Sequence, residues 1–205
     1  VSYFRDLELT KKYKNLKGKK IGFFIISCEK YKSKHAKFDN MPDTFIVIGK
    51  PNMEQNYKLI GNHLYVKAND LYFGLPEKVI MTIEAFNNLK ELKKYKYLYK
   101  IDDDCKIDTN KSQNELNNFV SKNDYSGVLL NNNLGKKQSE SNKTYHQKYS
   151  YQDPNNFWSI NKYEGNYVNY LRGSNYILSR NLTQKINKIW GSHNKELLKK
   201  TEVFE

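Results

Sequence analysis

The sequence predicts an α/β fold in a single domain, and three observations support this prediction. Short apolar runs recur along the chain between polar segments, which is typical of strands in a parallel sheet that is covered on both faces. A long amphipathic helical pattern separates two of these runs, as in a sheet flanked by helices. The chain has 205 residues, which is long enough for one sizeable core.

The N-terminal half of the chain predicts three strands. Ile21–Ile26 is a continuous apolar run, and Thr44–Gly49 is a second run that Pro51 terminates. Leu64–Val66 predicts a short third strand. The polar segment 27–39, between the first two strands, is expected to form a loop or a short helix.

The middle of the chain predicts one helix followed by one strand. From Leu75 to Lys94 the apolar residues recur at spacings of three and four, which indicates an amphipathic helix. Pro76 is tolerated in the first turn of such a helix. The next apolar run, Tyr97–Ile101, predicts a fourth strand. It leads directly into three consecutive carboxylates, Asp102–Asp104.

The C-terminal half predicts two more strands and two more helices. A helix is expected over Gln113–Ser121 and a strand over Gly127–Leu130. Tyr176–Leu178 predicts the last strand, which precedes a helix over Asn181–Trp190. The intervening segment 131–165 is polar and aromatic, with Gly, Asn and Pro throughout. A long segment of this kind inside a compact domain is usually functional.

The net charge of +13 raises the question of a nucleic-acid or membrane partner. Asn, Lys and Tyr are heavily used whereas Arg is rare, a profile that an AT-rich genome produces without selection for a polyanion. Because Arg is the side chain best suited to bidentate phosphate and base contacts, its scarcity argues against nucleic acid as a partner. No apolar stretch approaches the roughly 18 residues of a membrane-spanning helix, so no membrane segment is expected.

The acidic run at the end of the fourth predicted strand indicates a metal site. In an open parallel sheet, ligands bind at the carboxyl ends of the strands. Asp102 and Asp104, two residues apart on extended backbone, would point to the same side and repel each other. A hard cation such as Mn²⁺ or Mg²⁺ relieves this repulsion and can bridge to phosphate oxygens of a substrate. The alternative is that the run caps a turn or lies on the surface.

Three segments resemble one known family in the same order. Tyr97–Asp104 resembles the strand and Asp-x-Asp motif of β-1,3-galactosyltransferase-type enzymes, which include the Fringe glycosyltransferases. Upstream, Asp70–Lys78 resembles the family's Asp-x-Tyr-x-Asn-Leu-x-x-Lys segment, with Gly74 in place of the usual Asn. Downstream, Tyr170–Arg180 resembles its Tyr-x-x-Gly-x-Gly-Tyr-x-Leu-Ser segment, with Asn175 where Gly is common.

The resemblance implies a GT-A (Rossmann-like) fold, with a mixed, largely parallel sheet flanked by helices. It also implies a metal-dependent glycosyltransferase that uses Mn²⁺ (or Mg²⁺). Such an enzyme moves a hexose or N-acetylhexosamine from a UDP-sugar to a sugar hydroxyl of a glycan or glycoprotein acceptor, with inversion. The metal is expected at Asp102 and Asp104. The expected donor-binding residues are Ser27, Asp70, Tyr72, Lys78, Asp102, Asp103, Gly173 and Ser174.

The catalytic base is the least defined part of this reading. The family carries it in a Glu-Asp-Val segment after the Gly-rich motif, whereas this chain ends in Thr201–Glu205. Either Glu202 belongs to a degenerate form of the segment, or Glu205 begins the segment and its Asp lies outside the sequence. We favour the second reading, in which a domain over 19–205 follows an N-terminal extension over 1–18 and is incomplete at its C-terminal end.

The aromatic residues of the segment 131–165 include the expected acceptor contact, Trp158, because aromatic faces stack well on sugar rings. The alternative for these side chains is a role in covering the core. Three alternatives for the function stay open at this stage. They are a retaining GT-A transferase, a polyanion-binding module that depends on the positive charge, and a catalytically inactive relative that binds sugar nucleotides.

Overall fold

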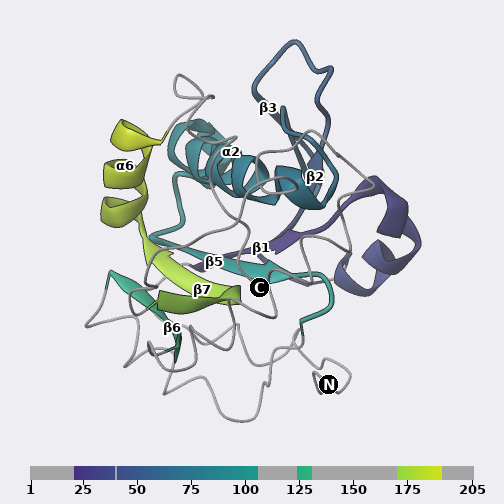
Figure 1. Ribbon diagram of the computed structural model, residues 1–205. Helices are drawn as coiled ribbons and strands as arrows, with labels where there is room; N and C mark the ends of the chain where they lie inside the picture. The colour runs from purple at the N-terminus through teal and green to yellow at the C-terminus, as the bar shows by residue number, and fades with distance from the viewer. Residues whose placement is uncertain (1–20, 40, 106–123, 131–169, 191–205) are drawn as a thin grey trace.

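A seven-stranded sheet forms the centre of the molecule (Figure 1). The computed structural model describes residues 21–39, 41–105, 124–130 and 170–190. The strand order is β3-β4-β2-β1-β5-β7-β6, in which β4, β2, β1 and β5 run parallel and the other pairings are antiparallel. The strands span Ile21–Ile26 (β1), Thr44–Gly49 (β2), Tyr57–Ile60 (β3), His63–Val66 (β4), Tyr97–Asp102 (β5), Tyr125–Leu130 (β6) and Tyr170–Ser179 (β7).

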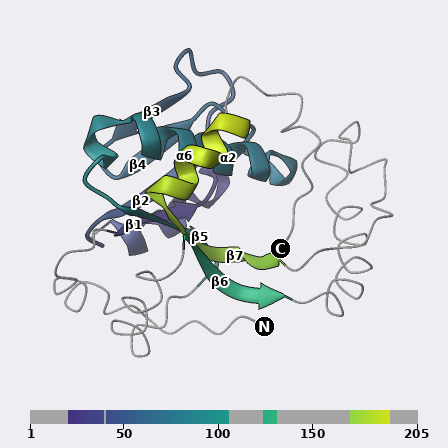
Figure 2. The same cartoon turned by 90° about the vertical axis from the view of Figure 1, so that its left-hand side faces the viewer.

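Helices cover both faces of this sheet. The α-helices α2 (Leu75–Asn88) and α6 (Arg180–Ile189) lie side by side on one face (Figures 1 and 2). The 3₁₀ segment η2 (Glu29–Phe38) packs against the other face, where Phe38 joins the apolar cluster. The prediction of a single α/β domain with a mixed, largely parallel sheet is therefore confirmed.

The apolar runs of the sequence correspond to strands that are buried on both faces. All six residues of β1 and all six of β2 are buried. Alternate side chains point to opposite faces, so Phe24 packs toward α2 whereas Ile25 packs toward η2. Continuous hydrophobicity, rather than alternation, is what such a position in the sheet requires.

The structure differs from the sequence prediction at several points. The helix predicted to continue to Lys94 ends at Asn88, because Leu89 adopts extended backbone (φ −66°, ψ 130°). The apolar spacing beyond it belongs to a 3₁₀ turn over Lys90–Leu92, in which Leu92 is buried. The hairpin strand β3 was not predicted. Finally, β7 begins well before the predicted Tyr176–Leu178.

Several predicted elements lie outside the described residues. These are the N-terminal extension 1–18, the helix over Gln113–Ser121 and the aromatic segment 131–165. The domain bounds therefore stay a prediction. Among the helices that the structure describes, none combines the length and the apolar character needed to cross a bilayer.

Candidate functional site

The carboxyl ends of β1 and β5 lie side by side at one edge of the sheet. The two strands are parallel, and Ile26 is paired with Asp102. From β1 the chain continues to β2 on one side, and after α2 it returns to β5 on the other side. Such a reversal of strand order is where ligands bind in open α/β sheets. The predicted acidic residues therefore lie at the position where the fold favours a binding site.

Ser27, the first residue after β1, connects η2 to the turn over Asp102–Cys105 that follows β5, called the acidic turn below. Its hydroxyl donates a 2.6 Å hydrogen bond to Asp103 Oδ2 and lies 2.9 Å from His35 Nε2. Since a hydroxyl has one proton, Nε2 must be the donor of the second bond. Burial and the nearby ring of His63 lower the pKa of His35, which agrees with a neutral imidazole. Lys37 Nζ completes the connection by donating to the Asp103 carbonyl at 2.8 Å.

An ion pair between the buried Lys78 and the partly buried Asp70 supports the same edge. Lys78 Nζ lies 2.7 Å from Asp70 Oδ1 and 2.7 Å from the Ser27 carbonyl oxygen. Asp70 also accepts hydrogen bonds from the backbone N–H groups of Gly49 and Glu29, both at 2.7 Å. The pair thus joins the start of α2 to the ends of β1 and β2. Lys78 and Asp70, both predicted to bind the sugar-nucleotide donor, therefore have protein groups as their hydrogen-bond partners.

The three carboxylates of the acidic run do not share one direction. Asp102 ends β5, and a turn follows in which the Cys105 N–H donates to the Asp102 carbonyl at 2.9 Å. The expectation of extended backbone through Asp104 is therefore wrong. The turn nevertheless brings ligand atoms of Asp102, Asp104 and Cys105 within 4.8 Å of one another, whereas Asp103 contacts Ser27.

The donor set of this turn fits a hard divalent cation. Asp102 and Asp104 offer carboxylate oxygens, the ligands that Mg²⁺ and Mn²⁺ prefer. Cys105 is a poor ligand for such an ion, since burial raises the pKa of its thiol and its Sγ lies 3.4 Å from the Ser174 carbonyl oxygen. The two carboxylates are therefore the residues of this group that would hold the metal.

Asp102 is a weaker acid than an ordinary aspartate. Burial raises its pKa to about 6, and the neighbouring carboxylates of Asp104 and Asp103 act in the same direction. The ammonium of Lys100 opposes this shift through an ion pair with Asp102 Oδ1. Lys100 also donates to the Gly173 carbonyl at 2.5 Å.

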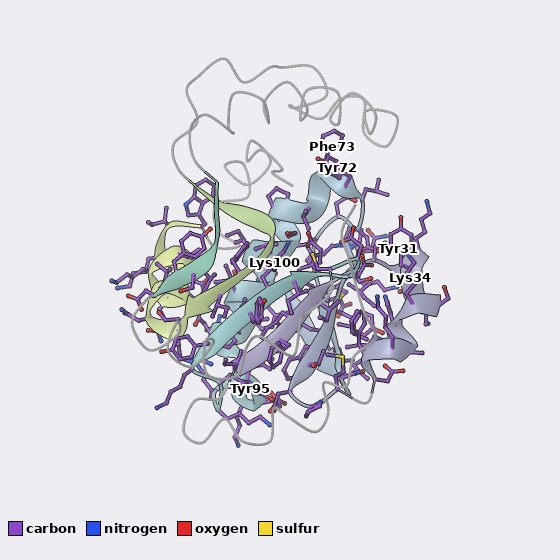
Figure 3. All side chains as sticks on the ribbon, turned by 90° about the horizontal axis from the view of Figure 1, so that it is seen from below. Tyr31, Lys34, Tyr72, Phe73, Tyr95 and Lys100 are labelled. Carbon is purple, nitrogen blue, oxygen red and sulfur yellow. The ribbon has the colours of Figure 1, made fainter. Side chains whose placement is uncertain are left out.

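The remaining predicted donor residues lie around this edge. Gly173 and Ser174 belong to β7, and their carbonyl groups accept from Lys100 and Cys105 respectively. Tyr72 lies in the 3₁₀ turn η3 (Tyr72–Gly74) at the start of α2, with its ring edge-to-face against Phe73 at 5.2 Å. Figure 3 shows this aromatic pair at one end of the sheet.

A comparison with protein families decides the identity of the chain. A model described as galactosyltransferase matches residues 43–199, which is well over half of the chain. The chain belongs to the galactosyltransferase family. The match includes Asp70–Lys78, the acidic turn and Tyr170–Arg180, so the resemblance seen in the sequence is confirmed. A comparison with curated proteins found no significant match.

Family membership makes the protein a glycosyltransferase. The roles of the individual site residues are predictions. The structure brings together Ser27, Asp70, Lys78 and Asp103 in one hydrogen-bonded network. The expected acceptor residue Trp158 and the two candidate bases, Glu202 and Glu205, lie outside the described residues.

Sequence reasoning missed two residues of this candidate site, Lys100 and His35. A lysine inside a strand predicted to be buried was a usable signal for Lys100, because buried lysines are almost always paired. His35 had no comparable signal, since it lies in a polar segment rich in Lys.

Proposed function

We propose that this chain transfers a hexose or N-acetylhexosamine from a UDP-sugar to a sugar hydroxyl, with metal dependence and inversion. One observation carries the proposal. In a member of the galactosyltransferase family, the carboxylates of Asp102 and Asp104 meet at the end of β5, beside Ser27 at the end of β1. Two converging oxygen ligands at such a strand end suit a metal-bound diphosphate.

The donor half of the site has residues for each task. Asp102 and Asp104 would hold Mn²⁺ or Mg²⁺, and when bound this ion supplies stabilisation of the negative charge on the diphosphate leaving group. Ser27 fixes Asp103 in place. The Lys78–Asp70 pair would hold the backbone at the ends of β1 and β2 in place through its hydrogen bonds to three backbone groups. Gly173 and Ser174 would border the sugar from β7.

The acceptor half rests on the sequence. A carboxylate, Glu205 or Glu202, would deprotonate the acceptor hydroxyl as it attacks the face of the sugar opposite to the departing diphosphate. Attack from that side inverts the anomeric carbon. Trp158 would stack on the acceptor ring.

A donor screen tests the proposal. The chain is incubated with UDP-galactose, UDP-glucose, UDP-N-acetylglucosamine, UDP-N-acetylgalactosamine and GDP-mannose, with Mn²⁺ or with EDTA, and release of nucleoside diphosphate is measured. We expect release from one or more UDP-sugars that EDTA abolishes. No release from any UDP-sugar, together with no UDP binding, would contradict the proposal. NMR of a transferred product then gives the anomer, and retention would refute inversion.

A further inference from the structure

Lys100 is an unusual residue in the middle of a buried strand. Its side chain is 4% exposed, and within the described part of the chain only Lys78 shares this degree of burial among lysines. Burying an ammonium group is costly unless hydrogen-bond acceptors and an opposite charge satisfy it. The partners of Lys100 therefore indicate why the position holds a lysine.

Those partners come from two distant parts of the sequence. The ammonium of Lys100 is paired with the Asp102 carboxylate, and it donates to the carbonyl of Gly173 at 2.5 Å. The ring of Tyr176 lies 5.8 Å from Nζ, within the range of a cation–π contact. One buried cation thus contacts both the acidic turn and the Gly173–Ser174 segment.

The position of Gly173 makes this contact more than a local pair. β5 and β7 are antiparallel, with Lys100 opposite Tyr176 and Ile101 opposite Asn175. Gly173 lies two residues beyond Asn175, past the last paired position. The Lys100 side chain therefore links the two strands where their ladder has ended, at the edge that carries the predicted donor-binding residues.

The ion pair between Lys100 and Asp102 also fixes the orientation of the Asp102 carboxylate. Lys100 engages Oδ1 of the carboxylate, which leaves Oδ2 as the oxygen available to a ligand. A carboxylate held by one oxygen has a fixed orientation, and such partners of a ligating group are known to tune metal affinity.

We propose that Lys100 is a positioning residue of the donor site, which holds Asp102 and the Gly173 carbonyl in the arrangement that binds a metal–nucleoside diphosphate. The inference rests on the proposed function and deepens it. In this role Lys100 would affect UDP binding through its contacts with Asp102 and the Gly173 carbonyl. A purely structural role would instead make Lys100 matter for folding alone.

Three variants separate these roles. Lys100→Met keeps the apolar stem and removes the ammonium. Lys100→Arg keeps the charge, but its planar guanidinium cannot occupy the position of a compact ammonium group. Tyr95→Phe is the matched control, because it removes a partly buried hydrogen bond from the Tyr95 hydroxyl to Asp43 Oδ1 (2.6 Å) at the opposite end of β5 (Figure 3).

The measurement is the affinity for UDP at saturating Mn²⁺ by calorimetry, together with free Mn²⁺ by electron paramagnetic resonance in the presence of UDP. We expect Lys100→Met to weaken the binding of UDP and the UDP-dependent binding of Mn²⁺, each by about 10- to 100-fold. Lys100→Arg should fall between this variant and the wild type. Tyr95→Phe should lower the melting temperature and keep wild-type affinity.

A folded Lys100→Met variant with wild-type affinity would overturn the inference while leaving the proposed function intact. If that variant does not fold, Lys100→Arg decides, and wild-type affinity in it would overturn the inference as well. A wild-type chain that binds no UDP with Mn²⁺ would overturn the proposed function and this inference together.

Discussion

The hydroxyl of Ser27 donates a 2.6 Å hydrogen bond to the carboxylate of Asp103, across 76 residues of sequence. This bond extends the contact between β1 and β5 beyond their last paired residues, Ile26 and Asp102. It also assigns the three carboxylates of the acidic run to different tasks. Asp103 is held by the protein, whereas Asp102 and Asp104 converge on the predicted metal position.

Replacing Ser27 by Ala should weaken both the fold and the site. The change leaves His35 Nε2 and Asp103 Oδ2 without their shared partner, and each is partly or fully buried. We expect a loss of about 1–3 kcal/mol in the free energy of unfolding, measured by urea denaturation, and weaker UDP binding in Mn²⁺. The control is Ser179→Ala, which removes the N-cap of α6 and should cost about 1 kcal/mol without changing the affinity. Equal affinity in both variants would contradict the role of Ser27.

The metal-dependent binding of UDP should weaken below a pH of about 6. Asp102 has a pKa of about 6 because burial disfavours its charged form, and protons compete with a metal for the same carboxylate. With an ordinary pKa of 3.8 the decline would begin about two pH units lower. The measurement is UDP affinity with Mn²⁺ across about pH 5 to 7.5, repeated in EDTA as a control. An affinity that is constant over this range would contradict the prediction.

The raised pKa of Asp102 affects the stability of the metal-free protein in the opposite direction, because here a rising pH is unfavourable. Because the folded state keeps its proton to a higher pH than the unfolded state, the contribution of Asp102 to the free energy of unfolding decreases as the pH rises from 3.8 to about 6. Asp102→Asn should remove this contribution, and pH-dependent urea denaturation of the two chains in EDTA would reveal the difference.

Arg180 should matter for stability and not for UDP binding. Its guanidinium donates to the carbonyl groups of Phe86, Leu92 and Tyr95 and lies 4.0 Å from the centroid of the Phe86 ring. Lysine cannot satisfy three such acceptors with the same geometry. We therefore expect Arg180→Lys to lower the free energy of unfolding by about 1–3 kcal/mol and to leave the UDP affinity unchanged. A loss of affinity at matched stability would show that the two regions are coupled.

Much of the fold could be predicted from the sequence because a strand that is buried on both faces requires a continuous run of apolar residues. The continuous apolar runs of β1 and β2 are of this kind, and Ser179 marks the start of α6 through its side-chain bond to the Leu182 N–H. The end of α2 has no such signal in the sequence. Leu89 and Leu92 continue the helical spacing of apolar residues although the backbone has already changed direction.

The candidate site could be predicted in part for a different reason. The motifs identify which residues gather at the strand ends, but not which of them bind one another. Asp70 and Lys78 match the family segment, yet their partners are each other and backbone groups. Gly74 departs from that segment, and the structure supplies a reason, because a Cβ atom there would lie 2.2 Å from the Asn69 carbonyl oxygen. Contacts of this kind depend on positions in space that no spacing in the chain encodes.

The most direct test of the nucleotide-sugar site is the change in melting temperature that UDP causes, measured with Mn²⁺ and with EDTA, in the wild type and in Asp104→Asn. The variant keeps the shape of the side chain and removes the charge that a metal requires. We predict that UDP stabilises the wild type only when Mn²⁺ is present, and that Asp104→Asn loses this stabilisation while keeping its melting temperature without ligand. An undiminished shift in the variant, or the same shift in EDTA, would contradict the assignment of the metal to the acidic turn.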